Sequence, residues 1–177
     1  MNLKWKKISV RRLPIGRYRS FLRKRYRLPN GHIDNFFILQ QLRVVAALVV
    51  TADRYIILAK QFRPGLDKIL WELPGGARDK QETSRQAIAR EVMEETGYRG
   101  RIHYLGSSTN DAWSTLWRDH YLITNAIKVG PPKPDLTEIT AVARVTRKKL
   151  RQLMTAGKMS DIETAYRGLE MLGKLYK

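Results

Sequence analysis

Residues 76–98 constrain the fold of this 177-residue chain more than any other segment. Thr83 is followed three residues later by Gln86, which is typical of a capping box at the start of a helix. Apolar side chains then recur at helical spacing as far as Gly97, a residue suited to the left-handed conformation that ends many helices. The pattern predicts one helix, at about residues 84–96.

Three carboxylates stand on the expected helix. Glu91, Glu94 and Glu95 are spaced i, i+3 and i+4, which brings their side chains onto one face. They repel one another, and Arg90 is the only cation close by in this run. A divalent cation would relieve the repulsion, because carboxylate oxygens are the ligands that Mg²⁺ and Mn²⁺ prefer. A solvated acidic surface is the alternative, and the triplet alone leaves both open.

Short runs rich in β-branched and aromatic residues lie on both sides of this helix in the sequence, and each is expected to form a strand. These runs are residues 36–42, 44–50, 55–61, 101–106, 120–126 and 140–145. Asp53 marks a hairpin between the second and third runs, and a last helical region is expected from Arg147, resuming after Gly157. Strands before and after a helix favour an α/β or α+β domain.

Positive charge is concentrated at the N-terminus. The chain has 34 lysine and arginine residues against 16 aspartate and glutamate residues, a net charge of +18. Residues 1–33 contain eleven of the cations and no acidic residue. Such a basic arm favours a polyanionic partner, with a solvated surface as the alternative. Aromatic residues interleaved with the cations leave base stacking open, namely Trp5, Tyr18, Phe21 and Tyr26.

Several function classes are excluded by the composition. The chain has no cysteine, hence neither a disulfide nor a thiol nucleophile, and its three histidines are too scattered for a zinc cluster. No apolar run approaches the roughly 20 residues of a membrane span. Arginines interrupt the N-terminal region where a signal peptide would need an apolar core. We expect a cytoplasmic protein with no membrane partner.

From Gly76 the sequence runs Gly-x5-Glu-x7-Arg-Glu-Val-x-Glu-Glu-x-Gly, with Glu82 and Arg90 at the first two charged positions. This segment resembles the Nudix box at all seven fixed residues. The resemblance implies a Nudix fold, in which a mixed β-sheet is sandwiched between helices. It also implies hydrolysis of a nucleoside diphosphate linked to another moiety, with Mg²⁺, or Mn²⁺ in its place, bridging the diphosphate and the helix.

The resemblance implies a role for each charged position of the box. The implied metal ligands are Glu91, Glu94, Glu95 and the carbonyl group of Gly76. Arg90 would orient Glu91 and is counted as a catalytic residue. Glu95 is counted as catalytic as well as metal-binding. Glu82 would pair with Arg90 behind the ligands and hold it in place.

Three stretches outside the box narrow the resemblance to the ADP-ribose and nucleoside-diphosphate-sugar pyrophosphatases. They read Arg-Val-Val-Ala-Ala from Arg43, Gln-Phe-Arg-Pro from Gln61 and Trp-Glu-Leu-Pro-Gly-Gly from Trp71. In that branch a β-rich N-terminal arm serves dimerisation. Residues 1–42 are therefore expected to form a dimerising arm, and residues 43–177 the Nudix domain.

The same resemblance implies the substrate contacts. Arg63 would hold a phosphate, Arg43 would reach the nucleotide of its own or the partner's site, and Glu72 is counted with them as substrate-binding. The alternative for Arg63 and Arg43 is that each is a surface arginine that does not contact the substrate. Trp113 is a candidate to stack on the base or line the sugar pocket; for Trp113 and Trp117, which are four residues apart, a packing role is the alternative.

The resemblance also implies a general base outside the box, on a loop before a late strand. Glu138 is our choice because it is the only glutamate between Glu95 and Glu163. The competing residues are Asp135, Asp119 and Asp111.

One departure from the branch broadens the expected substrate range. A proline is implied near Trp113, but Asn-Asp-Ala-Trp stands at residues 110–113. We expect a nucleotide-sugar substrate, ADP-ribose or another, with the base and the sugar left open. Hydrolysis of RNA 5′ ends or of dinucleoside polyphosphates is the alternative, followed by a non-catalytic regulator that binds ADP-ribose or nucleic acid. Any binding of nucleic acid by the arm is expected to be weak and nonspecific.

Overall fold

The computed structural model describes residues 3–15, 19–109, 111–133 and 140–175, and it divides the chain into two units. The first unit comprises residues 1–43 and 109–117, and the second comprises residues 44–108 and 118–177. The loop at residues 109–117 belongs to the arm unit because Leu39 of the arm forms two hydrogen bonds with it. The Leu39 N–H donates to the Trp113 carbonyl at 2.9 Å, and the Leu39 carbonyl accepts the N–H of Thr115 at 2.9 Å.

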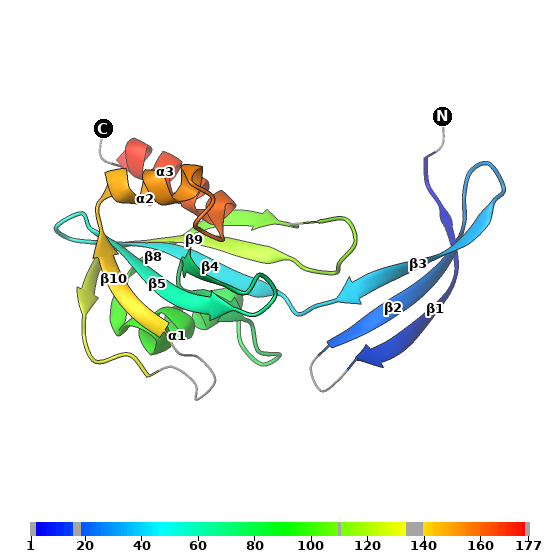
Figure 1. The fold of residues 1–177 in the computed structure, drawn as a ribbon, viewed down its shortest axis with the longest axis horizontal. Helices are drawn as coiled ribbons and strands as arrows, with labels where there is room; N and C mark the ends of the chain where they lie inside the picture. Colours follow the sequence, from blue (N-terminus) through cyan, green and yellow to red (C-terminus); the bar gives the residue numbers. More distant parts are fainter. Residues whose placement is uncertain (1–2, 16–18, 110, 134–139, 176–177) are drawn as a thin grey trace. The chain divides into compact units, whose positions relative to one another are not determined.

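The first unit is a three-stranded antiparallel sheet in the order β1-β2-β3, coloured blue in Figure 1. Its strands are β1 (Lys6–Ile15), β2 (Arg19–Arg27) and β3 (Ile33–Gln40). On one of its faces Trp5, Tyr26 and Phe36 pack together, with ring centroids 4.9 to 6.0 Å apart. Aromatic packing of this kind compensates for the small number of buried aliphatic residues in the arm.

A mixed seven-stranded sheet forms the centre of the second unit, with the order β10-β5-β4-β9-β8; of its two shorter strands, β6 pairs with β5 and β7 pairs with β4. The strands are β4 (Val44–Thr51), β5 (Ile56–Arg63), β6 (Lys68–Glu72), β7 (Gly75–Ala77), β8 (Tyr98–Ser108), β9 (Arg118–Lys128) and β10 (Thr140–Val145). β4 and β9 run parallel, and the other pairs are antiparallel.

Helices cover both faces of this sheet. Figure 1 shows α1 (Ser84–Thr96) on one face and α2 (Arg147–Thr155) with α3 (Ile162–Leu175) on the other. Alternate residues of β4 supply the two cores, because successive side chains of a strand point to opposite faces. Val45, Ala47 and Val49 pack with α1, whereas Leu48 and Val50 pack with the other two helices. The expected architecture, a mixed sheet between helices, is confirmed.

The centre of the sheet splays open where β4 and β5 separate. These neighbours pair only at Val49 with Ile57 and at Val50 with Ile56. Beyond that point β7 pairs with β4 while β6 pairs with β5. The diverging strands therefore place the β6–β7 connection between them. Within the described ranges, no helix has the length and apolar character needed to cross a membrane.

Candidate active site

The acidic helix α1 begins and ends where the sequence predicts. The hydroxyl of Thr83 accepts the N–H of Gln86 at 3.3 Å, and the Gln86 side chain accepts the N–H of Thr83 at 2.8 Å, which completes the capping box. Gly97 ends the helix at φ +74° and donates its N–H to the Met93 carbonyl at 2.9 Å. Buried Ala87, Ile88 and Val92 fix the helix on the sheet, and the acidic residues lie at the edge of this buried face, where Glu95 is itself buried.

Arg90 connects the carboxylates of this helix to one another. Its Nη1 donates to Glu91 Oε1 and to Glu94 Oε2, both at 3.0 Å. Its other nitrogens donate to both Glu82 oxygens, at 2.8 and 3.2 Å, and Nη2 also reaches the Ala77 carbonyl at 3.2 Å. The hydrogen bond from Arg90 lowers the pKa of Glu82, and the same contact raises the pKa of Arg90. Glu82 therefore anchors a guanidinium that stays charged.

The Gly75–Gly76 strand lies directly against the acidic helix. Gly75 donates its N–H to Glu95 Oε2 at 3.0 Å, and Glu95 is buried. A Cβ added to Gly76 would fall 2.5 Å from the carboxylate carbon of Glu91, and one added to Gly75 would collide with the Val45 carbonyl. Two glycines in a row are required here, since a side chain on Gly76 would push the strand away from the helix and one on Gly75 would push it away from β4.

The chemistry of this cluster fits a hard divalent cation. Glu91, Glu94 and Glu95 offer carboxylate oxygens, and the backbone of Gly76 offers a carbonyl beside Glu91. The Glu94 side chain is 46% exposed and that of Glu91 13%, so the cluster opens toward solvent at Glu94. Within the described part of the chain, no three acidic or histidine side chains are gathered closely enough to hold an ion. Arg90 donates to both Glu91 and Glu94, so it holds these two carboxylates close to each other.

A pocket of about 150 Å³ opens beside the two glycines, at the splay between β4 and β5. The fork of Arg63 forms one wall: its Nε donates to Glu72 Oε1 at 2.7 Å, and its Nη2 donates to the other oxygen. Glu72 is 7% exposed and Arg63 48% exposed, so the acid is buried while the cation faces outward. The hydrogen bond from Arg63 to Glu72 raises the pKa of Arg63. Two predicted substrate residues thus meet at the edge of the glycine strand.

The same pocket has a second ion pair that the sequence did not indicate. Arg118 Nη1 lies 2.6 Å from Asp161 Oδ1, and the hydroxyl of Ser160 donates to Asp161 Oδ2 at 2.8 Å. Burial raises the pKa of Asp161, an effect that the Arg118 charge opposes. Among the described residues the Nε–H of Arg118 is buried and has no hydrogen-bond partner. Asp161 resembled only a helix start in the sequence, and no local pattern marked Arg118.

Two predicted substrate residues belong to the arm unit. The guanidinium of Arg43 lies 6.0 Å from the ring centroid of Trp117. Trp113 stacks on Phe36, with ring centroids 6.1 Å apart and planes 27° apart. The packing that was the alternative for Trp113 is therefore present, while much of the ring stays exposed.

The proposed base Glu138 and its competitor Asp135 lie outside the described residues. The other two competitors have structural partners. Asp119 is buried and accepts the hydroxyls of Ser84 and Ser107, and Asp111 accepts the N–H of Trp113 at 2.6 Å. Lys133, the last described residue before residue 140, contacts the acidic helix, because it donates its N–H to the Glu94 carbonyl at 2.6 Å.

Comparisons with known proteins agree with this geometry. The NUDIX domain family model matches residues 41–164. An ADP-ribose pyrophosphatase of Bacillus subtilis (strain 168) is 32% identical over 144 residues, which cover 78% of this chain and 77% of that protein. A CMP-5'-(N-acetyl-N-hydroxy-3-aminopropyl)phosphonate hydrolase of Streptomyces rubellomurinus is 33% identical over 132 residues, 72% of this chain and 64% of that protein.

A solved structure described as an ADP compounds hydrolase has the same fold, with a TM-score of 0.83 at 15% identity over 99% of this chain and 98% of that one. The fold, the acidic helix behind its glycine strand and the matching family model all lead to one conclusion. The chain belongs to the Nudix family of hydrolases.

Proposed function

We propose that this protein hydrolyses the pyrophosphate bond of nucleoside diphosphate sugars, ADP-ribose included, and releases a nucleoside monophosphate and a sugar phosphate. The observation that carries the proposal is the position of Gly75 and Gly76. This strand touches the acidic residues of α1 and also lines the pocket that contains the Arg63–Glu72 fork. A diphosphate in the pocket can therefore meet a metal-binding helix and a phosphate-binding cation together.

The residues of the chain divide the work. Glu91, Glu94, Glu95 and the Gly76 carbonyl would hold Mg²⁺, or Mn²⁺ in its place. When bound, the cation supplies positive charge that neutralises the diphosphate oxygens during attack. Arg90 orients Glu91 and Glu94, with Glu82 holding Arg90 from behind. Arg63 grips a phosphate oxygen, and Glu72 keeps its fork in the pocket wall.

Water is the nucleophile in this proposal, and Glu138 takes its proton. The oxygen of water bonds to phosphorus as the bridging P–O bond breaks, and the bridging oxygen leaves with the other phosphate. The hydrogen bond from Lys133, five residues before Glu138, to the Glu94 carbonyl supports this assignment. Glu138→Gln should lower kcat about 10² to 10⁴-fold with KM nearly unchanged, because only proton transfer is lost. Full activity in Glu138→Gln together with an inactive Asp135→Asn would transfer the role to Asp135.

The relatives support a substrate in which a nucleotide is joined to a second group. One is named for ADP-ribose and the other for a CMP-linked phosphonate. We propose a range that is not confined to adenine, in line with the sequence Asn-Asp-Ala-Trp where the branch implies a proline. We also place the reaction in the cytoplasm and propose a homodimer formed through the arm.

A turnover panel tests the proposal. It comprises ADP-ribose, other nucleoside diphosphate sugars, dinucleoside polyphosphates and triphosphorylated RNA, each with Mg²⁺ present or chelated. We expect the highest kcat/KM for a nucleotide sugar and no turnover after chelation. Faster hydrolysis of RNA 5′ ends than of any nucleotide sugar would favour the alternative function. Binding of ADP-ribose with no turnover of any compound would make the protein a regulator.

A further inference from the structure

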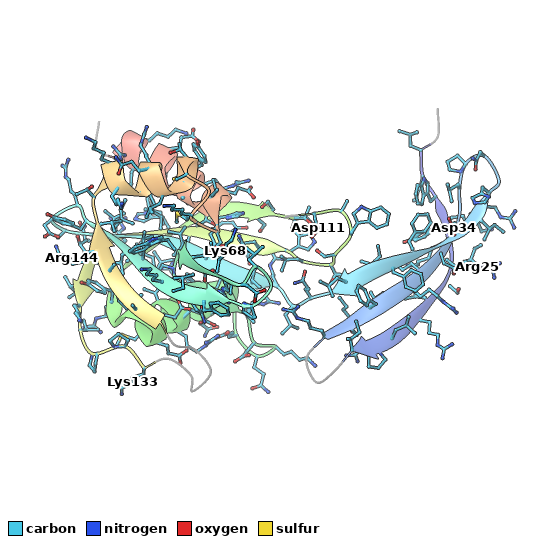
Figure 2. All side chains as sticks on the ribbon, in the orientation of Figure 1. Arg25, Asp34, Lys68, Asp111, Lys133 and Arg144 are labelled. Atoms are coloured by element: carbon cyan, nitrogen blue, oxygen red, sulfur yellow. The ribbon has the colours of Figure 1, made fainter. Side chains whose placement is uncertain are left out.

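Strand pairing places six cations on one face of the arm's sheet; five of them lie together, and the sixth, Arg19, lies beyond Phe21 at the far end of β2. Arg23, Arg25 and Arg27 alternate along β2, so their side chains share a face. Arg11 stands directly opposite Arg23, and Lys6 directly opposite Arg27. Cross-strand partners point the same way, so all five lie together, and all five are exposed. We call this surface the arginine face; Figure 2 shows Arg25 extending from it away from the strands.

No acidic residue within the described ranges neutralises the arginine face by forming an ion pair with any of its five side chains. Asp34 is the first acidic residue of the sequence, but it pairs with Tyr26 and so belongs to the opposite face. Like charges directly opposite each other destabilise a strand pair. An anion bound between Arg11 and Arg23, or between Lys6 and Arg27, removes that repulsion.

The spacing and chemistry of these cations suit phosphates in a row. Alternate residues of a strand are about 6.7 Å apart, which is close to the spacing of consecutive phosphates along an extended nucleic acid strand. Four of the five are arginines, whose planar fork makes bidentate contacts with phosphate. A diffuse anionic surface such as a membrane needs neither the regular spacing nor the fork.

One aromatic ring lies within this row. Phe37 of β3 stands directly opposite Arg23, so it shares the arginine face, and it is 54% exposed. A half-exposed ring between cations is the arrangement in which a base stacks while its phosphates are held. Leu13, Phe21 and Leu39 continue the same face toward the other end of the strands. That end, which also carries Ile15 and the exposed Arg19, remains available to a second copy of the chain.

We propose that the arginine face binds the phosphate backbone of single-stranded nucleic acid, with Phe37 stacking on a base and without sequence preference. The proposal does not rest on the hydrolase activity, because none of these residues belongs to the acidic helix or its pocket. It gives the basic arm a task that a small diphosphate substrate does not require.

The test measures binding of the full-length protein to a labelled RNA of about 12 nucleotides by fluorescence anisotropy. With five phosphates contacted, affinity should fall about a hundredfold between about 50 and about 200 mM salt. The double variant Arg23→Gln, Arg25→Gln should weaken binding about thirtyfold or more at low salt and flatten the salt dependence. Phe37→Leu should weaken it about fivefold or more through lost stacking.

A matched control changes the same number of charges on the other face. Lys7 pairs with Tyr26 and Lys24 pairs with Phe36, so both lysines lie on the other face of the sheet. The double variant Lys7→Gln, Lys24→Gln therefore removes two cations without changing the arginine face. We expect this variant to bind RNA within about threefold of the parent protein, since it keeps every proposed phosphate contact. Equal losses in the two double variants would mean that only net charge matters and would overturn the proposal. Binding to anionic vesicles with no measurable binding to RNA would overturn it in favour of a membrane surface.

Discussion

Gly76 lies so close to Glu91 that a methyl group on the glycine would fall 2.5 Å from the carboxylate carbon. The contact joins the glycine strand to the acidic helix, and so it sets the position of a proposed metal ligand. Gly76 does not have a positive φ angle, so its backbone conformation does not require a glycine. Its requirement is therefore for space alone.

Gly76→Ala tests this relationship. The added methyl should push the Glu91 carboxylate aside and lower kcat about a hundredfold, the cost typical of a misplaced catalytic group. Gly65→Ala is the matched control, because an added Cβ there meets nothing within 4 Å. Steady-state kinetics with a thermal melt of each variant will separate the effects. Normal turnover in Gly76→Ala would show that the contact has no catalytic importance.

Glu95→Gln removes one charge from the acidic cluster without a change of shape. The amide oxygen can still accept the N–H of Gly75, so the fold should persist. We expect kcat to fall about a thousandfold, equivalent to about 4 kcal/mol, because a ligand charge is lost. The measurement is kcat across a Mg²⁺ titration, with circular dichroism as the check on folding. Near-normal turnover at saturating Mg²⁺ would make the ligand assignment wrong.

Arg118→Gln should affect both substrate binding and stability. Arg118 lines the proposed substrate pocket and has a buried Nε–H without a partner among the described residues, so we expect it to donate to the substrate. Loss of this donor should raise KM about tenfold or more, since a charge-assisted hydrogen bond contributes about 1.5 to 3 kcal/mol. The variant should also lose about 3 kcal/mol of stability, because Asp161 is left without its partner in a mostly buried site. Adding Asp161→Asn should restore stability but not KM. A double variant that recovers both would assign Arg118 a purely structural role.

His120 makes stability depend on pH. It is fully buried, with Nε2 lying 2.8 Å from the Ser108 hydroxyl and Nδ1 2.7 Å from that of Thr164. Burial lowers its pKa from 6.5 to about 4. Between pH 6.5 and about 4, the His120 imidazole is therefore protonated in the unfolded chain but neutral in the folded chain. The free energy of unfolding should decrease as the pH falls from 6.5 toward about 4.

Denaturant unfolding of His120→Gln at several pH values checks this prediction. Glutamine can keep a hydrogen bond but has no titratable proton, so the pH dependence in this window should become shallower. His32→Gln changes an exposed histidine in the arm and serves as the control. An unaltered pH dependence in His120→Gln would assign the acid sensitivity to another group.

The sequence predicted the acidic helix well because its signals are local. Thr83 with Gln86 and the C-cap Gly97 each act within a few residues, and the structure contains both caps. The strand over 44–50 was also found, since an almost wholly apolar run is buried on both faces.

Other features depend on contacts between distant residues. Arg118 and Asp161 come together only after the chain has folded, and no sequence motif around either residue indicates the ion pair. The hairpin of β1 and β2 was expected only as a β-rich arm, because β1 is almost wholly exposed and β2 carries cations at most of its positions, so neither sequence shows the apolar and polar alternation that a core imposes. The basic residues that obscured the strands also produce the arginine face.

The arm leaves apolar side chains exposed that a second copy of the chain would cover. Ile8, Val10 and Ile15 of β1 are each close to half exposed. Deleting residues 1–35 should therefore give monomers or aggregates with impaired catalysis.

Ile15→Asp is a gentler test of dimerisation through the arm. It should weaken the dimer about tenfold or more because an aspartate replaces a side chain whose burial contributes about 1.5 to 3 kcal/mol. Ile127→Asp is the matched control, since Ile127 is just as exposed but lies in the Nudix unit. Light scattering that finds the full-length protein to be a folded, active monomer would refute dimerisation through the arm.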